Sequence, residues 1–217
     1  MDVDEALRST RAVRRRLDLD RPVGRHVVEE CLRLALQAPN GSNLQLWRWV
    51  VVDDPGVRAR MADVYRAAMD EYVASGEVDP AHYTSPEAVR ISASVAHLRE
   101  VLHRVPVLVV PLVTAPLAGA SVFVQASLWG SVLPAVWSFM LALRARGLGS
   151  AWTTVHLRRE REMADVLGVP AGAATQVGLF PVAYTVGTDF RPGPRREPAE
   201  VVDWNRWGGG GAAGSGG

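Results

Sequence analysis

The sequence is poor in cysteine, and it lacks the short signatures of several common enzyme classes. Cys31 is the only cysteine among 217 residues, so an intrachain disulfide is excluded. No Gly-x-Gly-x-x-Gly that opens a helix and no Gly-x-x-x-x-Gly-Lys-Ser/Thr occurs, which leaves a Rossmann or P-loop nucleotide site unsupported. There is also no Gly-x-Ser-x-Gly elbow and no Cys/His pair with zinc spacing. Hydrolase and metalloenzyme interpretations therefore lack their required residues, and no metal site is predicted.

The charge is nearly balanced, which argues against one class of partner. The chain has 24 basic and 23 acidic residues and a net charge of +1. A dedicated nucleic-acid binder is usually more basic, so no nucleic-acid partner is predicted. The basic excess is local, because seven arginines fall within the first 25 residues: Arg8, Arg11, Arg14, Arg15, Arg16, Arg21 and Arg25. This cluster fits either a solvated helix end or a phosphate site, and charge alone leaves both interpretations open.

One uncharged stretch, from Val105 to Leu143, is long enough to contain a membrane-spanning helix. Prolines interrupt its first half, where the short run Val107–Val113 predicts a buried strand. The rest predicts one long helix, Ser121–Arg146, which is hydrophobic on nearly all sides and suits either a membrane or the centre of a soluble core. Its glutamine and serines favour the soluble core, so no membrane association is predicted. The lone Cys31 fits a reducing compartment, and we expect a cytoplasmic protein.

The remaining periodicity predicts one α/β layer system in which helices outnumber strands. Further helices are expected at 4–16, 27–37, 57–74, 86–102 and 158–167. Further strands are expected at 47–52, 151–155 and 174–182, and a polar loop or lid at 75–86. Residues 1–207 are expected to form a single domain with a C-terminal arm. Residues 208–217 contain only Gly, Ala and Ser and are expected to be a disordered tail.

Four segments carry residues suited to a bound anion with a flat polar ring. The first is Arg11-Ala12-Val13-Arg14-Arg15, and the second is the loop Ala38-Pro39-Asn40-Gly41-Ser42-Asn43-Leu44-Gln45-Leu46-Trp47 between a helix and a strand. Arginines bind phosphate, and Asn, Ser and Gln side chains can hydrogen-bond a ring edge. The third segment is Gly147–Thr154 and the fourth is Arg195-Arg196. Taken singly, the third also fits a helix C-cap before a strand, and the fourth a solvated loop.

The order of these segments resembles the nitroreductase-like flavoenzyme family over almost the whole chain, from about Leu7 to Trp207. Members of that family carry an Arg-x-x-Arg stretch and an Ala-Pro-Ser-x-x-Asn-x-Gln-Pro-Trp-like loop. The segment Pro181–Phe190 resembles the one that leads to their C-terminal phosphate-binding arginine. The resemblance implies an α+β fold with a central mixed or antiparallel sheet flanked by helices. It further implies an intertwined homodimer with two FMN molecules at the subunit interface and the apolar 121–143 helix at the core of the dimer.

By the same resemblance, the residues that hold FMN fall into three groups. The phosphate would be bound by an N-terminal set and one distant arginine: Arg11, Ala12, Val13, Arg14 or Arg15, and Arg195. The ribityl chain and ring edge would be lined by the polar loop: Pro39, Asn40, Gly41, Ser42, Asn43 and Gln45. The ring would lie near Ser150, Thr153 and Thr154. Two departures from the family pattern are Leu46, where a Pro before Trp is usual, and the longer run 14–18. The choice between Arg14 and Arg15 therefore stays open.

The resemblance also implies the chemistry. Hydride would pass from NAD(P)H to flavin N5 and then to a nitroaromatic, quinone or similar conjugated acceptor in a ping-pong cycle. The cofactor would carry this chemistry, so no catalytic side chain is required. Two alternatives stay open: the same fold performing flavin-dependent dehydrogenation or dehalogenation, and a non-catalytic flavin-binding protein. The sequence does not distinguish NADH from NADPH.

Overall fold

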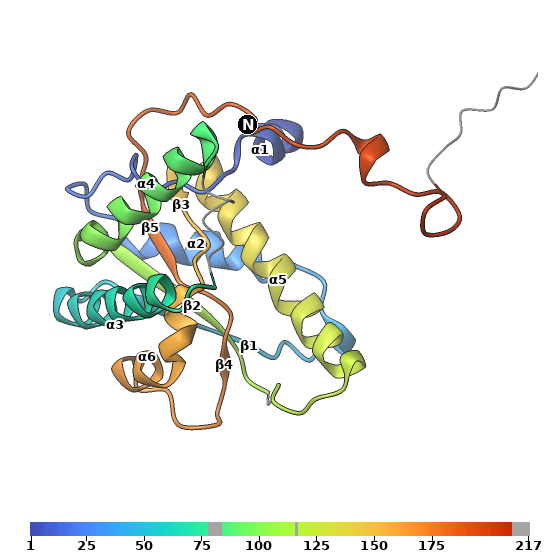
Figure 1. Ribbon diagram of the computed structural model, residues 1–217. Helices are drawn as coiled ribbons and strands as arrows, with labels where there is room; N and C mark the ends of the chain where they lie inside the picture. Colours follow the sequence, from blue (N-terminus) through green and yellow to red (C-terminus); the bar gives the residue numbers. More distant parts are fainter. Residues whose placement is uncertain (78–83, 116, 210–217) are drawn as a thin grey trace, which may run out of the picture.

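A five-stranded sheet forms the centre of the protein (Figure 1). The computed structural model describes residues 1–77, 84–115 and 117–209. Four strands lie side by side in the order β1 (Trp47–Val52), β2 (Val107–Val113), β5 (Phe180–Tyr184) and β3 (Leu148–Ser150). The short β4 (Thr175–Gln176) pairs with the end of β2. The strand pairs within the described residues are antiparallel, which confirms the expected α+β class with an antiparallel sheet.

Strand β2 is the central strand, and all of its residues are buried. Val107, Val109 and Val113 face one hydrophobic core, whereas Leu108, Val110 and Leu112 face another. This is the two-residue alternation of a strand that is covered on both faces. The strand predicted at 107–113 is therefore confirmed, and its uniformly apolar sequence reflects burial on two sides.

Helices cover the two faces of the sheet. One core packs against α2 (Arg25–Ala35) and α5 (Val122–Ala145), and the other against α3 (Pro55–Ala74), α4 (Pro86–Val101) and α6 (Glu160–Leu167). In Figure 1, α3, α4 and α6 lie on one side of the strands and the long α5 on the other. Two of these helices begin as the sequence predicts, with a side-chain cap followed by proline at the first turn: Asp54 accepts from the Val57 N–H, and Ser85 from the Ala88 N–H.

The N-terminal helix is shorter than predicted. Helix α1 spans Val3–Ser9, and the Thr10 N–H closes its last turn on the Ala6 carbonyl. The basic segment that follows is not helical, because the Val13 N–H donates to the Ser150 carbonyl at 2.8 Å and so joins this segment to β3. The prediction of a helix through Arg16 was wrong because Val13 and Leu17 turn into the core while the arginines between them stay nearer the surface.

Two strand predictions were also wrong in detail. The segment after β3 does not form a strand at 151–155; it bridges at Thr153 and then enters the 3₁₀ helix η4 (Val155–Arg159). The strand expected at 174–182 is divided into β4 and β5. The division falls at Gly178, where the backbone passes so close to Trp152 that a Cβ atom would lie 2.7 Å from the Trp152 Nε1 atom.

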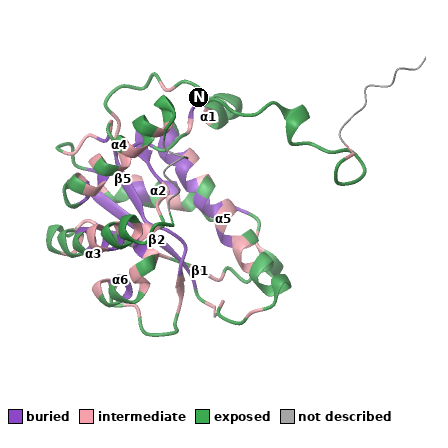
Figure 2. Ribbon diagram, viewed as in Figure 1, coloured by how far each residue is buried: buried purple, intermediate pink, exposed green. Residues whose placement is uncertain are grey.

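Helix α5 is buried along its second half and exposed along its first. Residues 121–127 are exposed, whereas Val136, Phe139 and Leu143 lie in the core (Figure 2). Among the described residues it is the one helix long and apolar enough to cross a membrane, and 39% of its most apolar window is buried. The predicted helix at 121–146 is confirmed, and its C-terminal half does belong to the core of the protein.

The chain after β5 crosses the top of the molecule and then leaves it as an arm (Figure 1). The arm contains a short 3₁₀ turn, η5 (Pro198–Glu200), and two exposed tryptophans, Trp204 and Trp207. Residues 210–217 of the expected tail and residues 78–83 of the expected loop lie outside the described residues.

Candidate functional site

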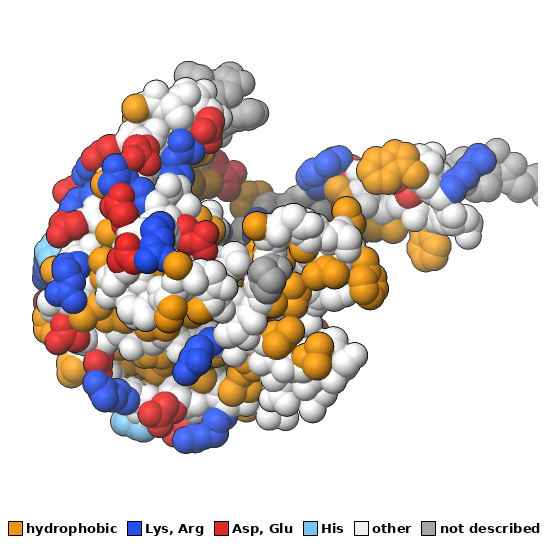
Figure 3. All heavy atoms as spheres, turned by 90° about the horizontal axis from the view of Figure 1, so that it is seen from below, with side chains coloured by type: hydrophobic (Ala, Val, Ile, Leu, Met, Phe, Trp, Pro, Cys, Tyr) orange, Lys and Arg blue, Asp and Glu red, His pale blue; other side chains and the backbone are white. Residues whose placement is uncertain are grey.

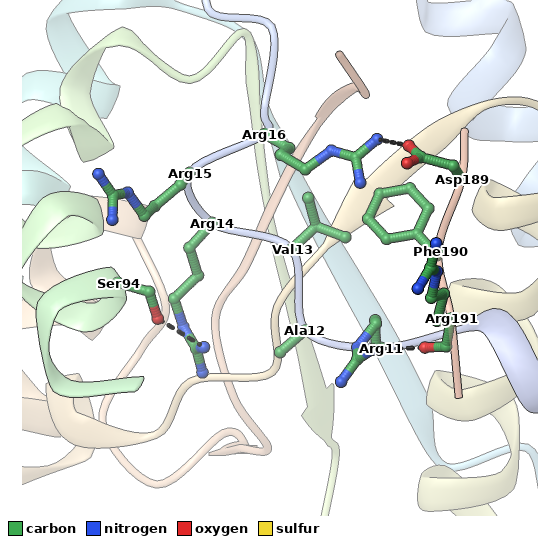
Figure 4. Close-up of a pocket in the computed structure, with 10 residues that line it drawn as sticks. All are labelled: Arg11, Ala12, Val13, Arg14, Arg15, Arg16, Ser94, Asp189, Phe190 and Arg191. Atoms are coloured by element: carbon green, nitrogen blue, oxygen red, sulfur yellow. Dashed lines mark hydrogen bonds and ion pairs between the residues drawn. The ribbon is translucent and has the colours of Figure 1, made fainter. Parts of the chain in front are cut away.

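The N-terminal arginines and the chain after β5 together form a cavity of 380 Å³ (Figure 4). Its walls are the consecutive residues 11–16, Ser94 of α4, and the segment Asp189–Arg191. The two wall segments are far apart in the sequence, and the antiparallel bridge between Leu17 and Thr185 holds them side by side. A cavity lined by this many arginines is suited to an anion with more than one negative charge.

Most of the arginines in this cavity have no acidic partner among the described residues. Arg16 is paired with Asp189 at 2.6 Å, and this guanidinium lowers the pKa of the Asp189 carboxyl. Arg11, Arg14, Arg15 and Arg191 make no ion pair with any described carboxylate. Asp189 is the one carboxylate among the residues that line this cavity, and it also interacts electrostatically with Arg191. The arginines outnumber it and repel each other, so a bound anion would relieve this repulsion.

Arg195, in the segment after β5, lies beside the same arginine cavity. A Cβ atom built on Gly193 would lie 2.9 Å from Arg11 Nη2 and 3.0 Å from Arg195 Nη1, so these two guanidinium groups are close neighbours. Arg11 also donates to the Arg191 carbonyl, which ties the N-terminal segment to the chain after β5. The structure therefore brings Arg11 and Arg195 together, although they lie near opposite ends of the sequence.

Arg14 and Arg15 take different directions. Arg14 is half-buried, donates to the Ser94 hydroxyl at 3.3 Å, and has its pKa lowered by burial. Arg15 is exposed, and in Figure 4 its side chain points away from Phe190 and Arg11. Arg14 also lines a second cavity next to the first, so it stands at the boundary between the two.

The second cavity, of 790 Å³, lies between α3, α4 and the segment after β3. Its lining is mostly apolar, with Met69, Val73, Ile91, Val95 and Trp152 among its walls. Polar residues line it as well, and these include the predicted Thr153 and Thr154 together with Tyr65 and Arg14. A wide, apolar space with a few polar groups at one edge suits a flat conjugated ring.

Tyr65 fixes the position of Thr153 at the edge of this cavity. The Tyr65 side chain is buried, and its hydroxyl lies 3.1 Å from Thr153 Oγ1. Burial raises the pKa of the Tyr65 phenol, so this group is neutral at physiological pH. The Thr153 backbone also makes two hydrogen bonds with Leu179, one as donor and one as acceptor. These bonds fix the position of the backbone at this edge of the cavity.

The polar loop at 38–47 lies elsewhere, beside the exposed half of α5. Asn40, Gly41, Ser42 and Gln45 line a third cavity of 240 Å³, and the Gly41 N–H donates to the Ser131 hydroxyl at 3.0 Å. Three residues of the loop have positive φ angles, namely Ser42 at 51°, Asn43 at 54° and Gln45 at 52°. Such left-handed backbone in residues other than glycine is uncommon, and it concentrates at binding sites.

Within one chain the polar loop and the arginines are therefore apart. The loop is attached to α5 at Ser131, and the arginine end of the helix is attached to α1 through Arg144, whose Nε donates to the Ser9 hydroxyl at 3.2 Å. At a rise of about 1.5 Å per residue, these two points on α5 are about 20 Å apart. The predicted site thus exists as two separate parts in a single subunit.

Four of the predicted residues are not part of the cavity walls. Pro39 precedes the loop and Asn43 lies within it, where the Asn43 side chain accepts a hydrogen bond from Gln45 Nε2 at 3.2 Å. Ser150 is buried, and its carbonyl supports the arginine segment through Val13. Arg195 lies beside the first cavity as a neighbour of Arg11 and does not form part of its wall.

Sequence reasoning did not select Tyr65, Ser94, Phe190 and Arg191 as site residues, although the structure places each of them in the wall of one of the first two cavities. Tyr65 and Ser94 are single helix residues that no motif sets apart. Phe190 ends the segment Pro181–Phe190 that resembles the family, and Arg191 follows it directly, so this segment was the signal available for both. Among the described residues, no group of three or more His, Cys, Asp and Glu is placed to hold a metal ion.

Comparison with known proteins identifies the family. The family pattern described as "Nitroreductase family" matches residues 7–184, which contain the arginine segment, the polar loop and the whole sheet. The chain belongs to the nitroreductase family. This confirms the resemblance drawn from the sequence, and it supports an oxidoreductase of the flavoprotein type.

The chain is also similar to one curated protein whose name refers to NADH. Over 104 residues the chain is 34% identical to "NADH dehydrogenase" of Thermus thermophilus, an alignment that covers 48% of this chain and 46% of the relative. The match thus spans about half the length of that curated relative.

Two solved structures share the fold over nearly the whole chain. An iodotyrosine deiodinase bound to FMN and 3-iodo-L-tyrosine has a TM-score of 0.72 at 23% identity, and the match covers 94% of this chain and 100% of the deiodinase chain. An FMN- and NADPH-dependent nitroreductase from Sphigopyxis sp. strain HMH has a TM-score of 0.69 at 20% identity, with coverage of 95% and 100%. These likenesses establish the nitroreductase fold.

Proposed function

We propose that this protein is an FMN-dependent oxidoreductase that takes hydride from NAD(P)H and delivers it to a nitroaromatic, quinone or similar conjugated acceptor. The observation that carries the proposal is the arginine-rich cavity that shares Arg14 with a large, mostly apolar cavity. A phosphate monoester attached to a flat ring is complementary to that pair of spaces. When bound, FMN supplies the hydride transfer, so the protein needs no acid–base side chain of its own.

The arginine cavity fits the phosphate. Arg11 and Arg195 approach each other without a carboxylate between them, and Arg14 adds a third positive charge that is partly withdrawn from water. Arginine suits this role because its planar fork can donate two hydrogen bonds to phosphate oxygens. Arg14 is favoured over Arg15 for the phosphate because Arg15 is exposed and directed away from the other arginines.

The apolar cavity fits the ring and the substrate. Thr153 and Thr154 present hydroxyl groups at its edge, and Tyr65 holds the Thr153 hydroxyl in place. The walls that α3 and α4 contribute are mostly apolar, which suits contact with the faces of a flat conjugated ring. The width of the cavity leaves room for a flat acceptor to stack beside the ring.

A second subunit completes the site in this proposal. Within one chain the polar loop lies far along α5 from the arginines, and the first half of α5 exposes Val122 and Phe123 at 84% and 79% of their surface. Figure 3 shows hydrophobic side chains gathered at this end of the molecule and on the arm. We propose an intertwined homodimer in which exposed α5 surfaces pack together, so that loop residues of one subunit meet the FMN bound by the arginines of the other. These loop residues are Asn40, Ser42, Asn43 and Gln45.

The names of the similar proteins support a reduced nicotinamide as electron donor, since one is called an NADH dehydrogenase and another an FMN- and NADPH-dependent nitroreductase. The deiodinase among the solved structures supports the alternative of reductive dehalogenation on the same scaffold. Turnover of nitroaromatics, quinones and halogenated phenols under NADH and under NADPH would separate these activities. We expect a cytoplasmic protein with no membrane or nucleic-acid partner.

The decisive experiment is the visible absorption spectrum of the purified protein before and after anaerobic addition of NAD(P)H. Flavin bands that bleach on addition would support a reducible flavoenzyme. Replacing Arg11→Ala together with Arg195→Ala should remove FMN, whereas the control Arg33→Ala with Arg60→Ala deletes the same charge from exposed helix positions and should retain it. A protein that stays colourless after incubation with FMN would refute the cofactor, and bound flavin that is not reduced would favour a non-catalytic role.

A further inference from the structure

Phe190 lies at the point where the chain after β5 meets the arginine cavity. Two guanidinium groups lie against its ring: Arg16 Cζ is 4.2 Å from the ring centroid, and Arg144 Cζ is 4.6 Å from it. Cations within about 6 Å of an aromatic centroid are attracted to the face of the ring. Phe190 is therefore clamped by arginines from two other parts of the chain (Figure 4 shows Arg16 beside it).

Both clamping arginines are anchored by further bonds. Arg16 Nε donates to the Val186 carbonyl at 2.8 Å, and Arg16 Nη2 pairs with Asp189 at 2.6 Å. Arg144 is buried; its Nη2 donates to the Thr188 carbonyl at 3.0 Å and its Nε to the Ser9 hydroxyl. The two arginines thus bind the ring and the backbone on its N-terminal side, which fixes the direction in which the chain leaves Phe190.

The residues that follow the clamp belong to the arginine cavity. Arg191 lines it, and the Arg191 carbonyl accepts a hydrogen bond from Arg11. Gly193 then lies against the guanidinium groups of Arg11 and Arg195, because a Cβ atom there would be 2.9 Å from Arg11 Nη2 and 3.0 Å from Arg195 Nη1. Because Arg191 and Arg195 lie on an otherwise exposed segment, their position depends on where Phe190 is held.

We propose that Phe190 is a positioning residue for the phosphate site, and that Arg191, which it places in the cavity beside Arg11, is a further phosphate-binding residue. Arg16 and Arg144 are then structural arginines that hold the ring, while Arg11, Arg14, Arg191 and Arg195 face the anion. The proposal rests on the proposed function, because the phosphate is taken to be that of FMN. The arginines of this region thus form two sets, one that holds the Phe190 ring and one that binds the phosphate.

The test compares FMN with riboflavin, which has the same ring and no phosphate. Dissociation constants for both are measured by flavin fluorescence on the apoprotein. Phe190→Leu should weaken FMN binding about tenfold, equivalent to about 1.4 kcal/mol, and leave riboflavin binding unchanged. Arg191→Ala should do the same. Phe190→Trp should restore FMN binding, because indole is the strongest partner of a cation among the aromatic side chains.

A core substitution provides the control. Phe139→Leu removes ring volume from the buried half of α5, away from the phosphate cavity, and should weaken neither flavin selectively. An FMN dissociation constant that is unchanged in Phe190→Leu, or raised equally for FMN and riboflavin, would overturn the positioning role. An unchanged constant in Arg191→Ala would remove Arg191 from the site.

A second readout separates the clamp from the cofactor. Trypsin can cleave after Arg195 and Arg196, and the rate of cleavage reports how firmly the segment is held. Faster cleavage in Phe190→Leu than in Phe190→Trp supports the clamp even if the wild-type protein binds neither flavin, in which case the proposed function fails and the clamp stands. Equal cleavage rates in the two variants would overturn the clamp directly.

Discussion

The two halves of α5 have similar apolar sequences and opposite surroundings. The second half packs Phe139 and Leu143 into the core, and even its Arg144 is buried with its hydrogen bonds made inside the chain. The first half exposes Phe123 and lies beside a strained polar loop. Hydrophobicity along the helix therefore does not decide burial. What decides it is whether the rest of the same chain supplies a surface to pack against.

The same contrast divides the candidate site. At the buried end of α5 the arginine cavity is organised by one chain, through the clamp at Phe190 and the bridge between Val13 and Ser150. At the exposed end the polar loop is organised by its own hydrogen bonds and lines the smaller cavity of 240 Å³ beside α5. In the proposed dimer, one subunit supplies the arginine part of the site and the other supplies the polar loop.

The largest effect is expected at the exposed first half of α5, where a charged side chain would test whether this apolar surface is a subunit interface. Phe123→Glu should dissociate the proposed dimer and release FMN, because a two-fold interface would bury the carboxylate twice without a partner. We expect a loss of more than about 4 kcal/mol in dimer stability, or roughly a thousandfold in the dissociation constant. Sedimentation and bound-flavin absorbance measure this. Val89→Glu, at another exposed position, is the control, and a Phe123→Glu protein that remains dimeric would contradict the assignment of the interface.

The next effect concerns the interior and depends on pH. His156 is fully buried, and burial lowers its pKa from 6.5 to about 4. The folded protein therefore keeps this histidine neutral while the unfolded chain binds a proton below pH 6.5, so stability is present above that pH and is lost as the pH falls towards 4. The loss is about 3 kcal/mol. Urea unfolding across this range measures it, and His156→Gln should flatten the dependence; an equally steep slope in that variant would assign it to other groups.

Alanine substitutions at two glycines compare packing in the buried core with packing in the exposed half of α5. Gly149, at the buried end, leaves no room for a methyl group, because a Cβ would lie 2.7 Å from Thr185 Cγ2 and 2.9 Å from Val13 Cβ. Gly149→Ala should lower the free energy of unfolding by about 2 kcal/mol. Gly130, in the first half of α5, has nothing within 4 Å, so Gly130→Ala should stabilise the Phe123→Glu monomer by about 0.5 to 1 kcal/mol. Thermal unfolding measures both changes in stability. Two changes of the same sign would show that the surroundings of Gly149 and Gly130 do not differ in packing.

The smallest effect concerns strain in the polar loop. Ser42 has a φ angle of 51°, which glycine adopts without a steric penalty. Ser42→Gly should raise the free energy of unfolding of the apoprotein by about 0.5 kcal/mol. Ser75→Gly, at a helix cap with a φ angle of −70°, should instead lower it. Chemical denaturation measures the free energy of unfolding of both variants. A Ser42→Gly protein that is less stable than the wild type would show that the loop is not strained.

Much of the fold could be predicted because the signals were local. The caps at Asp54 and Ser85, the apolar run of β2 and the long helix at 121–146 each depend on neighbouring residues, and each is confirmed. The predictions that failed depended on distant partners. The segment 10–16, predicted as the end of a helix, bridges to β3 instead, and the strand predicted at 174–182 is divided where Gly178 passes Trp152. Such contacts join residues that are distant in the sequence, so local sequence patterns do not predict them.

For the candidate site, the residue types and the family could be predicted from the sequence: the arginines, the polar loop and the Gly147–Thr154 turn follow each other in an order typical of the nitroreductase family. Which of these residues meet depends on the folded structure. Arg11 and Arg195 become neighbours because the antiparallel sheet returns the chain after β5 to its start, whereas the polar loop is held away by the length of α5. The physical reason is that contacts between distant segments are set by packing of whole elements, which no short stretch of sequence encodes alone.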